Sequence, residues 1–253
     1  MHINKNFMKT DLLLIALCCL FLQACNWGKK KTQQIEIKSD LTQLKIGDYY
    51  YSDGTFSSER DSSKMCVGIV FTLETSASEK AHGWTHGQII SLINVLAGEN
   101  VEWGTVNTEL KAPFEKSLKK VEIAANSLNG YDCSASPSVS GDSYKAFYIA
   151  RHFNSLLPSG KTSGWYLPSI GQWMTIISNL SKAQNAKSLF KTDGSFDAML
   201  ALENLDMLEL KTSSYWTSTQ ADKDMAWYVD FGTGSCSYES KDIRNMVRCV
   251  AAI

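Results

Sequence analysis

Hydrophobic and polar positions divide the chain into a short apolar run, a polar stretch and a long mixed region. The apolar run spans residues 12–22, and its eleven residues are too few for a helix that crosses a bilayer. Lys5 and Lys9 precede it, an arrangement typical of a secretory signal peptide. Residues 26–43 are mostly polar, and residues 44–253 hold no linker long enough to separate two domains. We therefore predict one folded domain over residues 44–253.

Strand patterns lie at both ends of this predicted domain. Residues 45–51 and 66–74 are rich in β-branched and aromatic side chains, which favours strands. The apolar run 88–96 fits a strand or a helix, because a short run does not distinguish them. Further β-rich runs, separated by glycines and turn residues, occur between residues 213 and 253 and predict an antiparallel meander.

Helical patterns fill the middle of the chain. Apolar residues recur at helix spacing over 114–128, and Asp142 is placed to cap a helix over 143–156. Ser169 and Gln172 have the spacing of a capping box at the start of an amphipathic helix. Trp173 lies on the apolar face of that helix, so we expect it in the core. Strands at both ends with helices between them indicate the α+β class.

Net charge gives no reason to expect a nucleic-acid partner. The first 25 residues carry two lysines and one aspartate, so 23 basic and 25 acidic residues remain after them, a net charge of −2. Nucleic-acid-binding domains are usually basic. We therefore expect none as a partner.

Four cysteines lie beyond residue 25: Cys66, Cys133, Cys236 and Cys249. In an oxidising compartment they permit two disulfides with three possible pairings. Cys236 and Cys249 are the pair we favour, because both lie in the predicted C-terminal strands and residues 241–244 can form a turn between them. Two buried free thiols are the alternative.

The end of the apolar run, "LQAC" at residues 22–25, resembles the lipobox of bacterial lipoproteins. The resemblance implies cleavage after Ala24 and a lipid on Cys25, with residues 1–24 as signal peptide and 25–43 as a lipidated tether. Several acyl chains anchor a protein almost irreversibly. We therefore expect a cell-envelope protein that is anchored to a membrane through Cys25, in the outer membrane of a Gram-negative bacterium. An uncleaved anchor or an ordinary secretory signal is the alternative.

Four segments, "GWYLPSIGQW", "YWTST", "AWYVDF" and "MVRCV", occur in that order from residue 164 onward. Together they resemble a domain of bacterial envelope lipoproteins that is related to the C-type-lectin-like fold and, more distantly, to sulfatase-modifying proteins. The resemblance implies a C-type-lectin-like α+β domain of antiparallel strands with flanking helices. It implies little chemistry, because the calcium-binding motifs of sugar-binding lectins are absent from the sequence.

Candidate catalytic and metal-binding residues are sparse. His82 and His86 have the spacing of paired ligands on a helix, but Gly83 and Gly87 oppose a helix there. Asp222 and Asp224 lie in a predicted turn, where alternate carboxylates can bind calcium only with further oxygen ligands. The sequence has no Gly-x-Ser-x-Gly motif of a serine hydrolase. We expect no enzyme activity, no cofactor and no metal.

Trp84, Trp103 and Asp222 are the candidate ligand-binding residues. The two tryptophans lie in polar, glycine-containing segments, and exposed aromatic faces suit sugar rings or peptides. Burial under loops is the alternative for both. The sequence thus predicts a non-catalytic binding module for a glycan, a peptide or a surface protein. A structural subunit of a surface appendage, or an enzyme related to sulfatase-modifying proteins, are the alternatives.

Overall fold

The computed structural model describes residues 34–253 except residues 117, 155, 181–189 and 192. Residues Ile35–Ile253 form one compact unit. This unit starts within the segment assigned to the tether, because Lys38 pairs with Phe56 through backbone hydrogen bonds of 2.8 and 2.9 Å. Cys25 and the predicted signal peptide lie outside the described residues. In the described part of the chain, no helix is long and apolar enough to cross a membrane.

The larger sheet is antiparallel and has the strand order β10-β4-β3-β1-β2. The ambiguous run 88–96 supplies strand β4 and then a 3₁₀ turn. All residues of β4 are buried, as are those of β3 after Cys66, which explains their dense β-branched composition. The strands are β1 (Tyr49–Tyr51), β2 (Phe56–Ser57), β3 (Cys66–Thr72), β4 (Gln88–Ser91) and β10 (Val250–Ala252).

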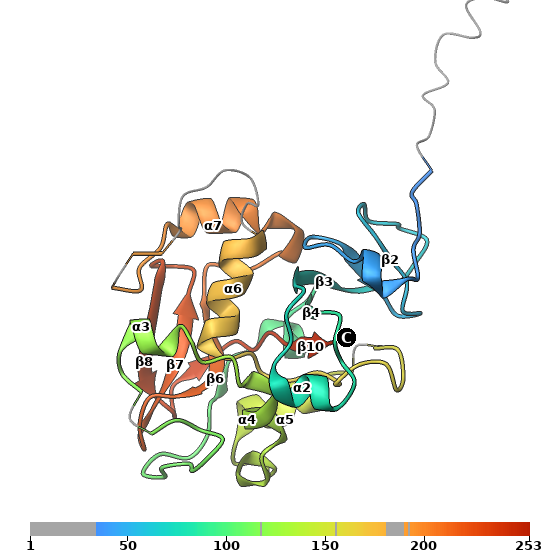
Figure 1. Cartoon of the computed structure of the whole chain (residues 1–253). Helices are drawn as coiled ribbons and strands as arrows, with labels where there is room; N and C mark the ends of the chain where they lie inside the picture. The colour runs from blue at the N-terminus through green and yellow to red at the C-terminus, as the bar shows by residue number, and fades with distance from the viewer. Residues whose placement is uncertain (1–33, 117, 155, 181–189, 192) are drawn as a thin grey trace, which may run out of the picture. The chain divides into compact units, whose positions relative to one another are not determined.

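The smaller sheet is the predicted meander, with the order β6-β7-β8 (Figure 1). The last β-rich run meets it only at Met246, which forms a parallel bridge with Tyr215 of β6. On either side of that bridge, β9 pairs with β5 in a separate two-stranded sheet, and β10 pairs with β4 in the larger sheet. The meander prediction is therefore correct for three strands and wrong for the final run. The strands are β5 (Val101–Glu102), β6 (Ser214–Gln220), β7 (Met225–Asp230), β8 (Ser235–Ser240) and β9 (Arg244–Asn245).

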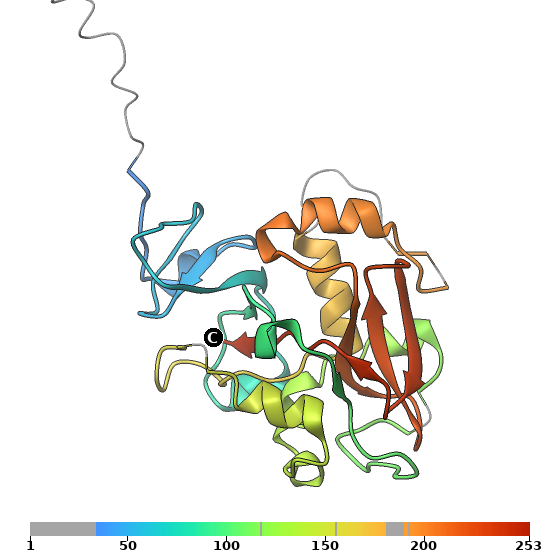
Figure 2. The ribbon, with the colours of Figure 1, turned by 180° about the vertical axis from the view of Figure 1, so that it is seen from behind.

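Helix α6 (Ile170–Leu180) packs between the two sheets, against β3 on one side and against β6 and β7 on the other (Figures 1 and 2). Its predicted capping box is present: Ser169 N donates to Gln172 Oε1 at 2.9 Å, and Gln172 N donates to Ser169 Oγ at 3.3 Å. Trp173 is fully buried and contacts Tyr215 and Phe231. The prediction that Trp173 belongs to the core is confirmed.

The other helices are short. The helix predicted over 114–128 is reduced to α3 (Val121–Ala124), because Phe114 and Leu118 enter two different core clusters rather than one helix face. Asp142 caps nothing, since α5 starts after Tyr144. The remaining helices are α2 (Ala77–Ala81), α4 (Gly130–Ala135), α5 (Lys145–Arg151) and α7 (Ala198–Asn204). The 3₁₀ turns are η1 (Leu41–Gln43), η2 (Val95–Gly98), η3 (Pro137–Val139) and η4 (Asp206–Leu208).

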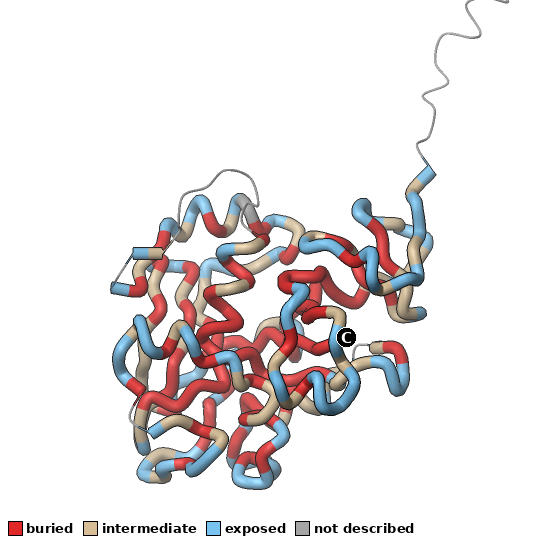
Figure 3. Tube along the Cα trace, viewed as in Figure 1, coloured by how far each residue is buried: buried red, intermediate tan, exposed pale blue. Residues whose placement is uncertain are grey.

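Antiparallel sheets with helices between and around them establish the α+β class. The buried residues follow the strands and α6, whereas the connecting loops are mostly exposed (Figure 3). Two hydrophobic clusters form the core, one around Trp103 and Phe147 and the other around Trp173 and Phe231.

Candidate functional site

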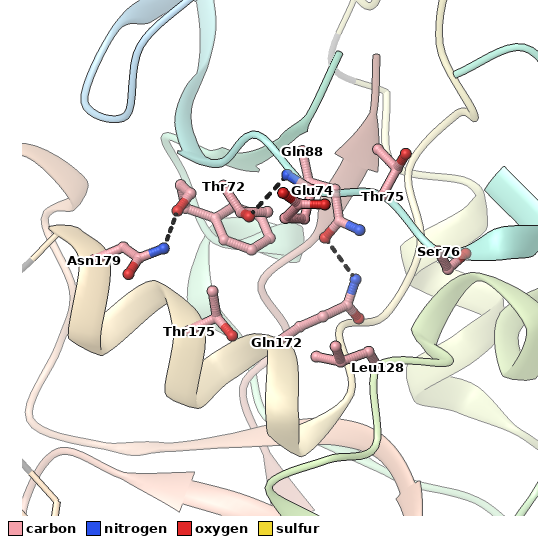
Figure 4. Close-up of a pocket in the computed structure, with 10 residues that line it drawn as sticks. Thr72, Glu74, Thr75, Ser76, Gln88, Leu128, Gln172, Thr175 and Asn179 are labelled. Carbon is pink, nitrogen blue, oxygen red and sulfur yellow. Dashed lines mark hydrogen bonds between the residues drawn. The ribbon is translucent and has the colours of Figure 1, made fainter. Parts of the chain in front are cut away.

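A pocket of about 330 Å³ opens between α6 and the ends of β3 and β4 (Figure 4). We call it the α6 pocket. Most of its side chains are uncharged and polar, Phe71 and Leu128 add apolar surface, and Glu74 is the acidic residue of the lining. The uncharged polar side chains of the lining are those of Thr72, Thr75, Ser76, Gln88, Gln172, Thr175 and Asn179.

Helix periodicity places three of these side chains side by side. Gln172, Thr175 and Asn179 lie three and four residues apart, so they share one face of α6 (Figure 4). Asn179 Nδ2 donates to the carbonyl of Phe71 at 2.9 Å, which ties the helix to β3. Thr175 Oγ1 donates to the carbonyl of Gly171 at 2.8 Å. The pocket wall is therefore held by regular secondary structure.

A buried hydrogen-bond network lies behind this wall and centres on Glu79 of α2. Its carboxylate accepts from Tyr166 Oη at 2.6 Å, from Gln88 Nε2 at 2.8 Å and from Ser76 N at 2.7 Å. Gln172 Nε2 donates to Gln88 Oε1 at 2.8 Å and to Tyr166 Oη at 2.9 Å. We call these residues, Glu79, Gln88, Tyr166 and Gln172, the Glu79 network.

The Glu79 network fixes how the two glutamines face the pocket. Burial and the neighbouring Glu79 carboxylate raise the pKa of Tyr166 well above its usual value, so this hydroxyl remains a donor at neutral pH. Each glutamine amide has a fixed orientation because its partners are fixed. Such a pre-oriented, mostly uncharged lining is suited to hydrogen bonding of a small polar molecule.

Trp84 is half-buried at the surface beside α2. Its ring stacks on His82 with centroids 4.9 Å apart and meets the edge of Tyr131 at 5.2 Å. His82 Nδ1 in turn lies 2.8 Å from the carbonyl of Ser78. The two histidines of the sequence motif do not form a metal site with other ligands, because the described residues contain no group of three His, Cys, Asp or Glu side chains placed for a metal.

Trp103 is fully buried, so it cannot offer a face to a ligand, and its assignment as a binding residue is wrong. Its indole Nε1 donates to the carbonyl of Thr217 at 2.7 Å, and its ring packs against Phe147 at 4.9 Å. Lys241 Nζ lies 5.0 Å from the ring centroid. Its polar sequence surroundings misled the prediction, because aromatic residues at α5 and strand β6 cover a side chain that looks exposed in isolation.

Asp222 stabilises the turn between β6 and β7. Its Oδ1 accepts from the backbone N–H groups of Asp224 and Met225, both at 2.8 Å, and its Oδ2 pairs with Lys119 at 2.5 Å. Partial burial opposes ionisation, yet the hydrogen bonds from Lys119 and the turn lower the pKa of Asp222 overall. These contacts give the carboxylate a structural role in the turn.

The bridge between Cys236 and Cys249 is absent, and all four cysteines among the described residues are free thiols. Cys236 belongs to β8 and the cluster around Trp173, whereas Cys249 precedes β10 in the cluster around Trp103. The predicted hairpin fails because the final run leaves the smaller sheet. Burial raises the pKa of both thiols, and that of Cys66 to about 11.

Sequence reasoning missed Gln88 and the Glu79 network. Gln172 was identified only as a capping residue, and Gln88 only as part of an ambiguous apolar run. Amides carry no recognisable catalytic or metal-binding spacing, so only the folded arrangement shows that these two meet.

Comparison with known proteins agrees with the α+β class. The solved structure of a fimbrial protein from Bacteroides ovatus ATCC 8483 matches with a TM-score of 0.56 at 18% identity, covering 83% of this chain and 49% of that one. This chain thus spans about half the length of that protein, and the likeness concerns the fold alone. No curated protein gives a significant match. The Lcl C-terminal domain family matches residues 101–251, which is more than half of the 253 residues. The chain therefore belongs to the Lcl C-terminal domain family.

Proposed function

We propose that this protein is a non-catalytic binding module of the cell envelope that holds a neutral sugar unit in the α6 pocket. A sugar presents hydroxyl groups around a ring with less polar faces. The second N–H of Gln88, the hydroxyl of Thr175 and the amide of Asn179 match the hydroxyls of the sugar, and Phe71 with Leu128 match the ring face. The Gln172 amide, whose hydrogen bonds are all made within the protein, holds Gln88 in place. The domain has, in this proposal, a variant of the C-type-lectin-like fold that binds without calcium.

The observation that carries the proposal is the pre-orientation of the pocket by the Glu79 network. Hydrogen bonds of 2.8 Å or so fix both glutamine amides before any ligand arrives. A ligand therefore avoids the entropy cost of ordering them.

This function is tested by adding neutral monosaccharides and short oligosaccharides to the purified protein and recording NMR chemical-shift changes during the titration. Asn179→Ala keeps α6 but removes one polar group of the pocket, and we expect it to weaken binding at least fivefold. Asn126→Ala, an exposed asparagine beside α3, is the matched control and should leave binding unchanged. Shifts confined to residues outside the α6 pocket would contradict the assignment.

Membrane attachment through Cys25 is a separate part of the proposal and rests on the lipobox resemblance. Cys25→Ser should move the protein from the membrane fraction to the soluble fraction after lysis without detergent. Equal retention of the variant in the membrane would contradict lipid anchoring.

A structural subunit of a surface appendage is the second candidate function. Its support is the fold shared with a fimbrial protein and a surface on which Met65, Ile93 and Leu156 are each more than half exposed. These three side chains line one hollow of about 330 Å³. Exposed apolar patches of this kind often mark protein contacts. Sedimentation analysis checks it: self-association that Ile93→Asp abolishes would favour assembly.

A further inference from the structure

Arg248, just before β10, is a buried cation without an acidic partner. It is fully buried, and its guanidinium donates to two backbone carbonyls, from Nη1 to Ser91 at 2.9 Å and from Nη2 to Leu208 at 2.6 Å. No ion pair to it occurs within the described part of the chain. Burial lowers the pKa of Arg248 to about 10, so the group remains charged at neutral pH. A buried charge without a counter-charge is costly.

Two buried polar atoms beside this charge lack hydrogen-bond partners. One is Arg248 Nε, a donor, and the other is Asn94 Oδ1, an acceptor. The Asn94 amide is held on its other side, where Nδ2 lies 3.4 Å from the hydroxyl of Tyr215. Unsatisfied groups of this kind are rare in folded proteins and need an explanation.

Both residues line an open pocket of about 370 Å³, which we call the Arg248 pocket. Lys211 lines it as well and adds a second positive charge, while Leu92, Ile93 and Ala97 supply apolar surface. The Arg248 pocket continues into the hollow that contains Met65 and Leu156, because the two share Leu92, Ile93 and Glu209. A charged end and an apolar extension therefore lie on one surface.

We propose that the Arg248 pocket binds the C-terminal carboxylate of a peptide. The carboxylate accepts from the exposed Lys211 and, once the side chains at the floor of the pocket shift to uncover it, from the buried Arg248 Nε. Charge-assisted hydrogen bonds of this type are strong. The backbone N–H of the last peptide residue donates to Asn94 Oδ1. Apolar side chains of the last residues then cover Ile93, Met65 and Leu156. Sulfate supplies no hydrogen-bond donor for Asn94 Oδ1, so it satisfies only half of the pocket. This inference does not depend on sugar binding in the α6 pocket.

Glu209 at the edge of the pocket is the internal competitor. It is exposed, and its carboxylate lies close enough to favour the charged form of Arg248. In the proposal it repels the ligand carboxylate, so Glu209→Gln should strengthen peptide binding about two- to fivefold. Weaker binding in this variant would contradict the proposed arrangement.

Hexapeptides with three varied C-terminal positions, each made as free acid and as amide, test the proposal by fluorescence polarisation on the purified protein. We expect free acids with apolar last residues to bind at least tenfold more tightly than their amides. Lys211→Gln should weaken the free acids about three- to tenfold. Lys111→Gln, an exposed lysine outside the pocket, is the matched control and should change nothing.

Asn94→Asp is a second test variant, which adds a negative charge to the pocket instead of removing a positive one. It places a carboxylate in the same pocket as Arg248, so it should abolish binding of the free acids while raising the melting temperature. Equal binding of acids and amides, or no binding of any free acid, would overturn the proposal. Binding of acetate or glucuronate as tight as that of the peptide acids would also overturn it, because the pocket would then be a simple anion site.

Discussion

The Glu79 network and the Arg248 pocket treat their buried polar groups in opposite ways. Behind the α6 pocket, the carboxylate of Glu79 accepts three hydrogen bonds from within the protein. In the Arg248 pocket, Arg248 Nε and Asn94 Oδ1 have no partner. The first arrangement stabilises the fold and shapes a surface in advance, whereas the second leaves hydrogen-bonding capacity for another molecule. The difference teaches that satisfied buried polar groups shape a site from behind, whereas unsatisfied ones keep hydrogen-bonding capacity for a ligand.

The largest expected effect on stability comes from Glu79, whose carboxylate accepts three hydrogen bonds. Glu79→Ala leaves Tyr166, Gln88 and the Ser76 N–H without their acceptor, and we expect a loss of about 3–5 kcal/mol in the free energy of unfolding. Urea denaturation measures it. Lys80→Ala, at the exposed next position of α2, is the control and should cost less than about 0.5 kcal/mol. Equal costs for the two variants would remove the distinction between the pockets.

A smaller loss of stability is expected when Arg248 is replaced, because its Nε has no hydrogen-bond partner. Arg248→Met takes donors from the carbonyls of Ser91 and Leu208 but also removes an uncompensated buried charge. We expect a net cost of about 1–2 kcal/mol by the same urea assay. A cost as large as that of Glu79→Ala would mean that Arg248 is fully satisfied within the fold.

The pH dependence of stability sharpens the comparison further. The pKa of Tyr166 is raised in the folded protein, so the unfolded chain loses this proton first as pH rises. The stabilisation is complete below about pH 10, the usual value for tyrosine, and is lost above it. Tyr166→Phe should reduce the slope of unfolding free energy against pH in this range by up to about 1.4 kcal/mol per pH unit. An unchanged slope would show that the pH dependence of stability in this range does not come from Tyr166.

The smallest effect concerns the four described thiols. Because Cys236 and Cys249 are separate and buried, a reductant should leave the melting temperature unchanged, and alkylation after unfolding should label the two in separate peptides. A linked peptide would show that the smaller sheet extends to the final run after all.

The features that could be predicted from the sequence are those set by residues close together along the chain. Ser169 and Gln172 are three positions apart and Trp173 follows the helix period, so the capping box and the buried face of α6 were predictable. Trp103 is covered by segments more than one hundred residues away, as its hydrogen bond to Thr217 shows. The polar pockets likewise bring together residues that are distant in sequence, such as Gln88 and Gln172. No local sequence pattern predicts these contacts.

The pairing of β10 with β4 has a consequence for the order of folding during synthesis. Val250 pairs with Ile90, so the outer edge of β4 has no neighbour until the chain has been made as far as β10. A nascent chain therefore carries an exposed, apolar strand edge through most of its synthesis, and such edges promote aggregation. Contacts this distant in sequence also form slowly. The larger sheet is therefore complete only when residues 250–252 are available to pair with β4.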